Sequence, residues 1–153
     1  MSGPKERLAE LGLTLPAVTP PVAAYVPAVQ TGNYVYVSGQ LPLVDGALPV
    51  TGKVGAEVSP EAAKELAARC ALNGLAATDA LVGLDRVVRV VKVVGFVASA
   101  PGFTGQPAVI NGASELLGSV FGEAGAHARS AVGVAELPLG APVEVEMIVE
   151  VSS

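Results

Sequence analysis

The spacing of apolar and polar residues in the first third of the chain predicts one short helix followed by two strands. Residues 4–12, PKERLAELG, have the spacing of a short amphipathic helix. The proline-rich residues 15–23 predict an extended connection. Residues 24–30 and 34–41 are strand-like, and residues 31–33, Thr-Gly-Asn, tolerate the positive φ of a tight turn. The pattern therefore predicts a strand pair after an N-terminal helix.

Two longer helices are predicted in the middle and the last third of the chain. Residues 59–61, Ser-Pro-Glu, suit the N-cap, the first helical position and the positive end of the helix dipole, and the helix is expected to run to about Val82. The second helix is expected from Pro107 to about Phe121, where Gly122 is placed to end it.

Between and after these helices the pattern is typical of strands. Residues 86–99, RVVRVVKVVGFVAS, are nearly continuously apolar and β-branched, which predicts a central strand buried on both faces. Residues 127–151 predict two closing strands joined by a short turn. The order β-β-α-β-α-β-β predicts an α+β sandwich with two main helices on one face of a mixed sheet.

The closing strands carry the candidate chemistry. Period-two alternation in the first of them separates a face that suits the helix-packed core from a face of small residues and one arginine. The expected core face has Ser130, Val132 and Val134, and the other face has Arg129, Ala131, Gly133 and Ala135. In the last strand, Glu144, Glu146, Ile148 and Glu150 share the face opposite a row of valines and Met147. If the two strands pair, Arg129 and a glutamate share the face away from the core.

Two interpretations of this arginine follow. The first is a surface ion pair with a glutamate, which contributes little to stability. The second needs Arg129 to be partly buried between subunits, where its planar fork holds a carboxylate bidentately. A neighbouring glutamate would then position or deprotonate a water molecule. The pattern alone leaves both open.

The composition bears on assembly and on location. The chain has 153 residues, which suits a single domain, with 51% hydrophobic, 15% charged and 4% aromatic residues. A chain with so many apolar and so few charged residues has difficulty covering its surface with polar groups. This indicates either association of subunits or simply a chain rich in alanine and valine. The N-terminus is too charged for a signal peptide, and no apolar run is long enough to cross a bilayer. We therefore expect a cytoplasmic protein without a membrane partner.

Charge and metal-ligand content exclude other classes of function. The net charge is −5, and the nine Lys and Arg residues are scattered, so nucleic acid is not an expected partner. One histidine and one cysteine, far apart, make no metal site. Cys70 is expected to be a small core residue. His127 is better interpreted as an exposed or hydrogen-bonded residue at a strand end than as a catalytic base.

Four segments together resemble the reactive-intermediate deaminases, the Rid or YjgF family formerly called L-PSP endoribonucleases. They are residues 23–42, 90–99, 109–122 and, most specifically, 128–151, ARSAVGVAELPLGAPVEVEMIVEV. The resemblance covers roughly residues 20–151. The chain departs from the family pattern by Ala131 in place of a cysteine, by His127 in place of a proline, and in the loop 100–107, which indicates a longer, divergent subgroup. The resemblance implies an N-terminal extension, residues 1–20, followed by a Rid-type domain, residues 21–153.

The resemblance also implies a fold, an assembly and a site. The fold would be similar to chorismate mutase, in a homotrimer with one site in each cleft between subunits. Arg129 would grip the substrate carboxylate, and Glu144 would orient the hydrolytic water. The residues expected to bind substrate beside them are Tyr25, Ser38, Gly39, Asn111 and, through its backbone, Ala131.

The implied reaction is the hydrolysis of 2-imino acids, or their enamine tautomers, to 2-keto acids and ammonia, without a cofactor or a metal. Positioning would supply much of the acceleration. Two alternatives stay open. One is a non-catalytic trimer that binds small carboxylates or regulates through the same cleft. The other is the older label of ribonuclease or translation inhibitor, which the acidic charge disfavours.

Overall fold

The fold is that of a computed structural model, which describes residues 3–18 and 24–153. Three helices, five strands and three short 3-10 turns follow one another along the described residues. In chain order they are α1 (Pro4–Glu10), β1 (Ala28–Thr31), β2 (Tyr34–Gln40), α2 (Pro60–Val82), η1 (Leu84–Arg86), β3 (Val87–Ala98), α3 (Gln106–Phe121), η2 (Gly122–Gly125), β4 (Ala128–Val134), η3 (Pro138–Gly140) and β5 (Val143–Val151). After α1, the predicted order β-β-α-β-α-β-β is confirmed.

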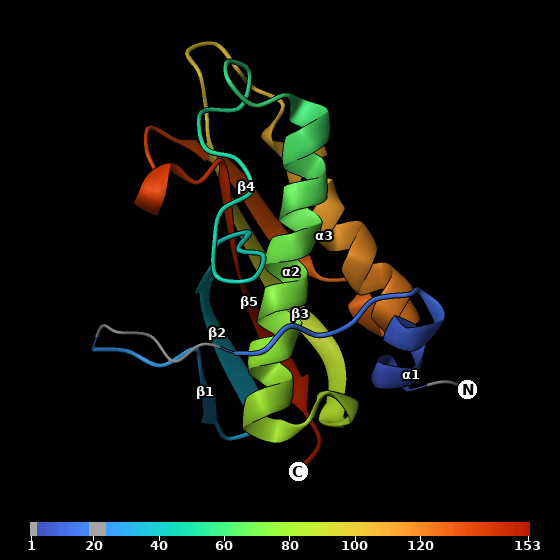
Figure 1. Cartoon of the computed structure of the whole chain (residues 1–153). Helices are drawn as coiled ribbons and strands as arrows, with labels where there is room; N and C mark the ends of the chain where they lie inside the picture. Colours follow the sequence, from blue (N-terminus) through green and yellow to red (C-terminus); the bar gives the residue numbers. More distant parts are fainter. Residues whose placement is uncertain (1–2, 19–23) are drawn as a thin grey trace.

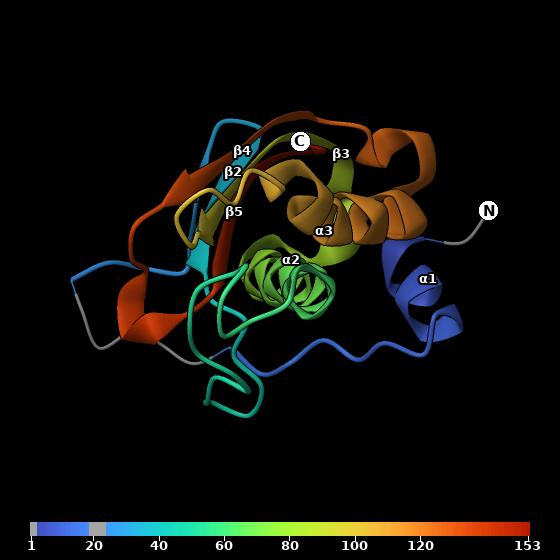
Figure 2. The same ribbon diagram turned by 90° about the horizontal axis from the view of Figure 1, so that it is seen from above.

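The strands form one mixed sheet in the spatial order β1-β2-β5-β3-β4. β4 runs parallel to β3, while the other neighbouring pairs are antiparallel. Helices α2 and α3 lie side by side on one face of this sheet (Figures 1 and 2). The predicted α+β sandwich with two main helices on one face is therefore confirmed.

Local signals set the ends of the two long helices as predicted. The Ser59 hydroxyl accepts a hydrogen bond from the backbone N–H of Ala62 at 3.1 Å, which caps the start of α2. Pro60 occupies its first turn, where a missing N–H costs nothing. At the end of α3, Gly122 adopts φ 62°, which a residue with a side chain rarely adopts.

The core between helices and sheet is built from valine, alanine and leucine rather than aromatic residues. Alternation in β5 buries every odd position, from Val143 to Val151, and leaves the even positions half-buried. The buried row packs under α2 and α3, where Leu75, Ile110 and Leu117 are fully buried. Cys70 is also fully buried in this core, as predicted.

Two expectations about the strands are wrong. β3 buries only one face, because Val90 is fully buried while Val88 is 47% exposed on the face that no helix covers. The closing strands β4 and β5 do not pair, because β3 lies between them. Both errors have one physical reason: long apolar runs do not specify which neighbours a strand takes.

The face assignment of β4 is also wrong. Its parallel register places Arg129 opposite Val93, Ala131 opposite Gly95 and Gly133 opposite Val97. These β3 positions are buried under the helices, so the arginine face of β4, and not its valine face, turns toward α3. Val132, which was expected in the core, is 44% exposed.

The N-terminal helix packs against the outer side of the helical layer (Figure 2). Leu8 is buried there, the Arg7 Nε donates to the carbonyl of Ser119 at 3.2 Å, and Lys5 pairs with Asp79 at 3.1 Å. The expected boundary between extension and domain, together with part of the extended connection 15–23, lies outside the described residues. No helix in the described ranges is long and apolar enough to cross a membrane.

Close approach of α2 and α3 depends on Gly112. A β-carbon at this position would lie 1.9 Å from the backbone oxygen of Lys64 on α2. We expect Gly112→Ala to lower the free energy of unfolding by about 1–3 kcal/mol, because a backbone atom cannot turn away as a side chain can. Gly118, on the same helix, is the matched control, since nothing lies within 4 Å of its β-carbon position.

Chemical denaturation of both variants checks this packing. Gly118→Ala is expected to stabilise the protein by about 0.5–1 kcal/mol, because alanine restricts the unfolded chain. Equal effects of the two substitutions would contradict the close helix contact.

Candidate functional site

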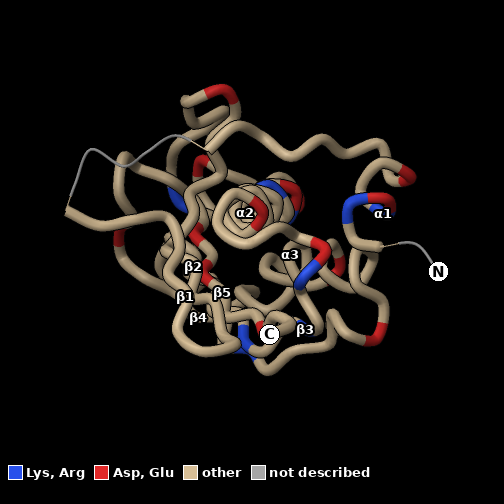
Figure 3. The backbone as a smooth tube through the Cα atoms, turned by 90° about the horizontal axis from the view of Figure 1, so that it is seen from below, with Lys and Arg blue, Asp and Glu red and all other residues tan. Residues whose placement is uncertain are grey.

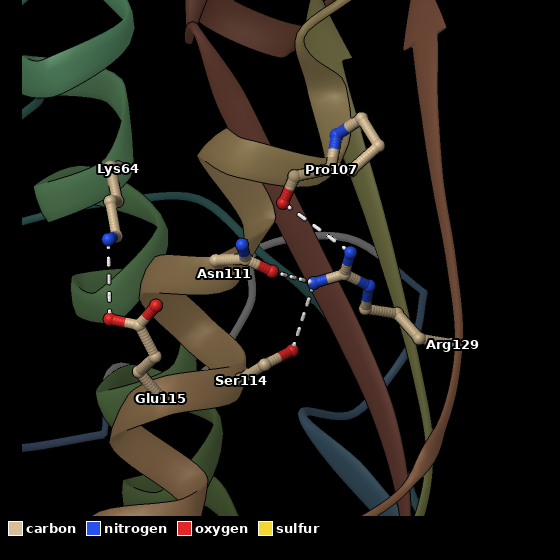
Figure 4. Close-up of polar contacts among 6 residues, drawn as sticks. All are labelled: Lys64, Pro107, Asn111, Ser114, Glu115 and Arg129. Atoms are coloured by element: carbon tan, nitrogen blue, oxygen red, sulfur yellow. Dashed lines mark hydrogen bonds and ion pairs between the residues drawn. The ribbon is translucent and has the colours of Figure 1, made fainter.

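Arg129 is held against α3 by three acceptors. Its Nη1 donates to Asn111 Oδ1 at 2.7 Å and to Ser114 Oγ at 3.2 Å, and Nη2 donates to the carbonyl of Pro107 at 3.4 Å (Figure 4). These helix positions are four and three residues apart, so they follow one another along a single face of α3. The guanidinium is therefore fixed by a rigid element and not by a loop.

The remaining donors of Arg129 suit a carboxylate. A guanidinium has five N–H donors, and the three contacts with α3 use both hydrogens of Nη1 and one of Nη2. The Nε–H and the second Nη2 hydrogen have no acceptor among the residues that the structure describes. These two donors lie along one edge of the planar group, which matches the two oxygens of a carboxylate. Asn111 contacts this guanidinium directly. Ala131, two residues further along β4, is half-buried.

A second group of the expected residues gathers around Glu144 on β5. A β-carbon on Gly39 would lie 2.0 Å from Glu144 Oε2, so the absence of a side chain at Gly39 makes the space for this carboxylate. The register between β2 and β5 shifts between Val37 and Gln40, as at a β-bulge, which is a common device for directing a side chain.

Ser38, in the same irregular stretch, ties this group to the segment that carries Tyr25. Its hydroxyl donates to the carbonyl of Val26 at 2.7 Å. Tyr25 precedes β1 and is 58% exposed. Tyr25, Ser38, Gly39 and Glu144 therefore belong to one side of the protomer.

Burial raises the pKa of the Glu144 carboxyl above its ordinary value, and the neighbouring carboxylate of Glu146 raises it further. Burial also raises the pKa of the Cys70 thiol well above its ordinary value, with a smaller contribution from Glu144. The thiol therefore stays neutral and unreactive. A carboxylate whose proton affinity is raised is a better base than an exposed glutamate. Such raised pKa values are typical of catalytic positions.

One protomer does not bring Arg129 and Glu144 into one pocket. Arg129 lies opposite Val93 of β3, on the helix-covered face of the sheet. Glu144 lies opposite Phe96 of β3, and alternation places it on the uncovered face. The expectation that Arg129 and a glutamate share the face away from the core is therefore wrong, because β4 pairs with β3 and turns its arginine toward α3.

His127 and Ser114 contact each other beside Arg129. His127 is half-buried, with Nε2 at 2.8 Å from Ser114 Oγ and Nδ1 against the carbonyl of Gly125, so the expected hydrogen-bonded strand-end histidine is confirmed. Ser114 was not predicted from the sequence, although its spacing three residues after Asn111 places both on one helix face. A hollow of about 420 Å³ is lined by Ser114, His127 and Arg129 together with the small residues Gly118, Gly122, Gly125 and Ala126.

The described residues contain no group of three or more His, Cys, Asp or Glu that could hold a metal ion. The two groups present instead the guanidinium of Arg129 and the half-buried carboxylate of Glu144.

Glu144→Gln is expected to raise the melting temperature at neutral pH by about 1–2 °C, a small effect because the group is only half-buried. The folded protein binds this proton more tightly than the unfolded chain, since burial raises the pKa. The stability that protonation of Glu144 contributes to the folded protein is fully present in acid, and it is lost as the pH rises through the folded-state pKa. The gain of the variant should therefore vanish below about pH 4.5, the ordinary pKa of the group.

Thermal unfolding from pH 4 to pH 8 measures this difference. Glu65→Gln, which removes an exposed carboxylate from α2, controls for the change in net charge. A gain that is independent of pH, or a loss at neutral pH, would contradict a proton affinity raised by burial.

Comparisons with known proteins agree with this architecture. The family model described as endoribonuclease L-PSP matches residues 16–151. Protein TCP17 of Trypanosoma cruzi is 49% identical over 148 residues, which cover 95% of this chain and 92% of the relative. A 2-iminobutanoate/2-iminopropanoate deaminase of Dermatophagoides farinae is 36% identical over 138 residues, covering 90% and 93%.

Solved structures show the same fold. Protein Atu1372 of Agrobacterium tumefaciens superposes with a TM-score of 0.90 at 49% identity, covering 98% of this chain and 94% of that one. The YjgF gene product of E. coli superposes with a TM-score of 0.61 at 28% identity, covering 88% and 95%. The match along nearly the whole chain, in sequence and in strand order, shows that this protein belongs to the endoribonuclease L-PSP family, also called the YjgF or Rid family.

Proposed function

We propose that this protein hydrolyses reactive 2-imino acids, or their enamine tautomers, to 2-keto acids and ammonia. The observation that carries the proposal is the anchored guanidinium of Arg129, whose free edge suits the carboxylate common to these substrates. The deaminase relative from Dermatophagoides farinae supports the same reaction class.

The proposed site is assembled from two protomers. Arg129, Asn111 and Ala131 lie at the β4 edge of the sheet, whereas Glu144 and Gly39 lie on its uncovered face toward β2. A second copy whose uncovered face meets the β4 edge of the first would bring the two groups together. Such a head-to-tail contact gives a ring when the rotation between copies closes, and we propose a closed ring of three copies, a homotrimer.

The uncovered face of the sheet supports this assembly. It exposes several large apolar side chains that a soluble monomer rarely leaves in water. They are Val29, Tyr34, Tyr36, Val88 and Val132, each between 43% and 50% exposed. Burial of this face between copies would remove that apolar area from water and stabilise the ring.

The chemistry asks for positioning and one base. Arg129 fixes the substrate carboxylate, and β4, as an edge strand, offers unpaired backbone N–H groups around Ala131. Glu144 takes a proton from water as the oxygen bonds to the imine carbon, which gives a tetrahedral carbinolamine. Glu144 returns this proton to the nitrogen, so that the carbinolamine is neutral. Glu144 then takes the proton of the new hydroxyl and passes it to the nitrogen as the C–N bond breaks, and ammonia and the 2-keto acid leave. No cofactor takes part in these steps.

The charge distribution disfavours the ribonuclease alternative. Basic segments are spread around the molecule, with acidic segments between them (Figure 3). The net charge of −5 adds repulsion toward a phosphate backbone. A carboxylate-binding trimer without turnover would share Arg129, and the assay below separates it from the enzyme.

The direct test is release of 2-keto acid and ammonia from imines that an amino-acid oxidase generates in the assay. The wild type should accelerate release, and Arg129→Ala should lower kcat/KM by about 10- to 100-fold, because a charge-assisted bidentate contact is lost. Arg129→Lys should recover only part, since an ammonium lacks the planar fork. Glu115→Gln, on the α2 side of α3, is the matched control (Figure 4).

Three outcomes are informative. Acceleration that depends on Arg129 supports the deaminase. A wild type that matches the uncatalysed rate over several amino acids, yet binds a 2-keto acid through Arg129, indicates the non-catalytic alternative. Neither turnover nor binding contradicts both.

Mixing two impaired variants tests the division of the site between protomers. Arg129→Ala and Glu144→Gln, unfolded and refolded together in equal amounts, form mixed trimers that each contain one site with both native residues. Three quarters of randomly assembled trimers are mixed, so about one quarter of wild-type activity should return. If Arg129 and Glu144 act within one protomer, the mixture is no more active than the average of the two variants.

A further inference from the structure

The Ser114 hydroxyl lies between Arg129 and His127. Its oxygen is 3.2 Å from Arg129 Nη1 and 2.8 Å from His127 Nε2. The other imidazole nitrogen of His127, Nδ1, lies against the backbone carbonyl of Gly125. The three side chains come from α3 and from the start of β4, and all three are half-buried.

The Gly125 carbonyl fixes the direction of this chain of hydrogen bonds. A carbonyl only accepts, so His127 Nδ1 carries a proton and donates it. In the neutral imidazole, Nε2 is then an acceptor, and the Ser114 hydroxyl donates to it. The lone pairs of the Ser114 oxygen consequently face Arg129 and accept from Nη1. Each link of this chain, from Arg129 Nη1 through Ser114 and His127 to Gly125, thus joins one donor to one acceptor.

This arrangement fixes the plane of the guanidinium. Asn111 accepts from one hydrogen of Nη1 at 2.7 Å, whereas the Pro107 carbonyl accepts from Nη2 at 3.4 Å, the longest of the three contacts. Ser114 accepts from Nη1 as well, and two acceptors on one nitrogen define the plane. Without His127, the Ser114 hydroxyl has a competing acceptor, the carbonyl of Ile110 four residues earlier on the helix. His127 thus holds the hydroxyl in the rotamer that Arg129 needs.

We propose that Ser114 and His127 are positioning residues, which together hold Arg129 so that its Nε and Nη2 edge meets the carboxylate of a small 2-imino or 2-keto acid. The inference rests on the proposed function, since it takes Arg129 as the carboxylate anchor. Neither side chain needs to touch the substrate. His127 acts only through Ser114, and this makes the two residues energetically dependent on each other.

The experiment measures the dissociation constant of 2-oxobutanoate by calorimetry with the intact assembly. Ser114→Ala and His127→Leu are each expected to weaken binding by about 3- to 10-fold, the effect of one lost hydrogen bond to a charged group. The double variant should bind no more weakly than Ser114→Ala alone, because His127 has no route to Arg129 without the hydroxyl.

His127→Gln is the conservative rescue. A glutamine amide offers a carbonyl oxygen to Ser114 and an N–H to Gly125, so binding should return to within about twofold of wild type. Glu115→Gln again serves as the control on α3, since it pairs with Lys64 on the side away from Ser114. A NMR order parameter for the Arg129 Nε–H bond adds a readout of position: it should fall in Ser114→Ala and His127→Leu and recover in His127→Gln.

The outcomes separate this inference from the function on which it rests. If Arg129→Ala binds 2-oxobutanoate as tightly as wild type, the proposed carboxylate anchor fails, and the inference with it. If Arg129→Ala binds weakly while His127→Leu matches wild type, only the inference is overturned. Losses that multiply in the double variant also overturn it, because they indicate two independent structural roles.

Discussion

The parallel pairing of β4 with β3 is the constraint on which the site depends. It sets Arg129 opposite the buried Val93, and a strand must present the same face as its neighbour at each paired position. Arg129 is thereby turned toward the helical layer. If only apolar side chains of the helices faced it there, its charge would be unpaired. The polar face of α3, with Asn111 and Ser114, supplies the acceptors that make this orientation stable.

The same sheet geometry separates the two halves of the chemistry. Because β5 buries its odd positions under the helices, Glu144 must point to the uncovered face, where Gly39 leaves room for it. Half-burial raises its pKa, which suits a base but costs stability at neutral pH. The protomer therefore holds the proposed anchor on one side and the proposed base on the other. Association of copies through the apolar uncovered face would bring Arg129 of one copy to Glu144 of another.

Much of the fold could be predicted from local signals in the sequence. Ser59 and Pro60 mark the start of α2, Gly122 ends α3, and the alternation in β5 identifies its buried row. These features depend on residues near one another in the chain. The family resemblance supplied the expected site residues, which no local pattern identifies.

The errors concern contacts between segments that are distant in sequence. Val132 and Val134 led to the prediction that their face of β4 lies in the core. The prediction is wrong because the face of the sheet that no helix covers also carries apolar residues. Neither the position of β3 between β4 and β5 nor the role of Ser114 can be read from periodicity. Both depend on which strand pairs with which, and that is a property of the whole sheet.

A crystal structure of the protein with 2-oxobutanoate tests the central claim most directly. We expect the ligand carboxylate on the Nε and Nη2 edge of Arg129 from one protomer, with the Glu144 carboxylate of a neighbouring protomer facing the keto carbon through a water molecule. A ligand bound away from Arg129, or one that meets Arg129 and Glu144 of the same protomer, would contradict this account.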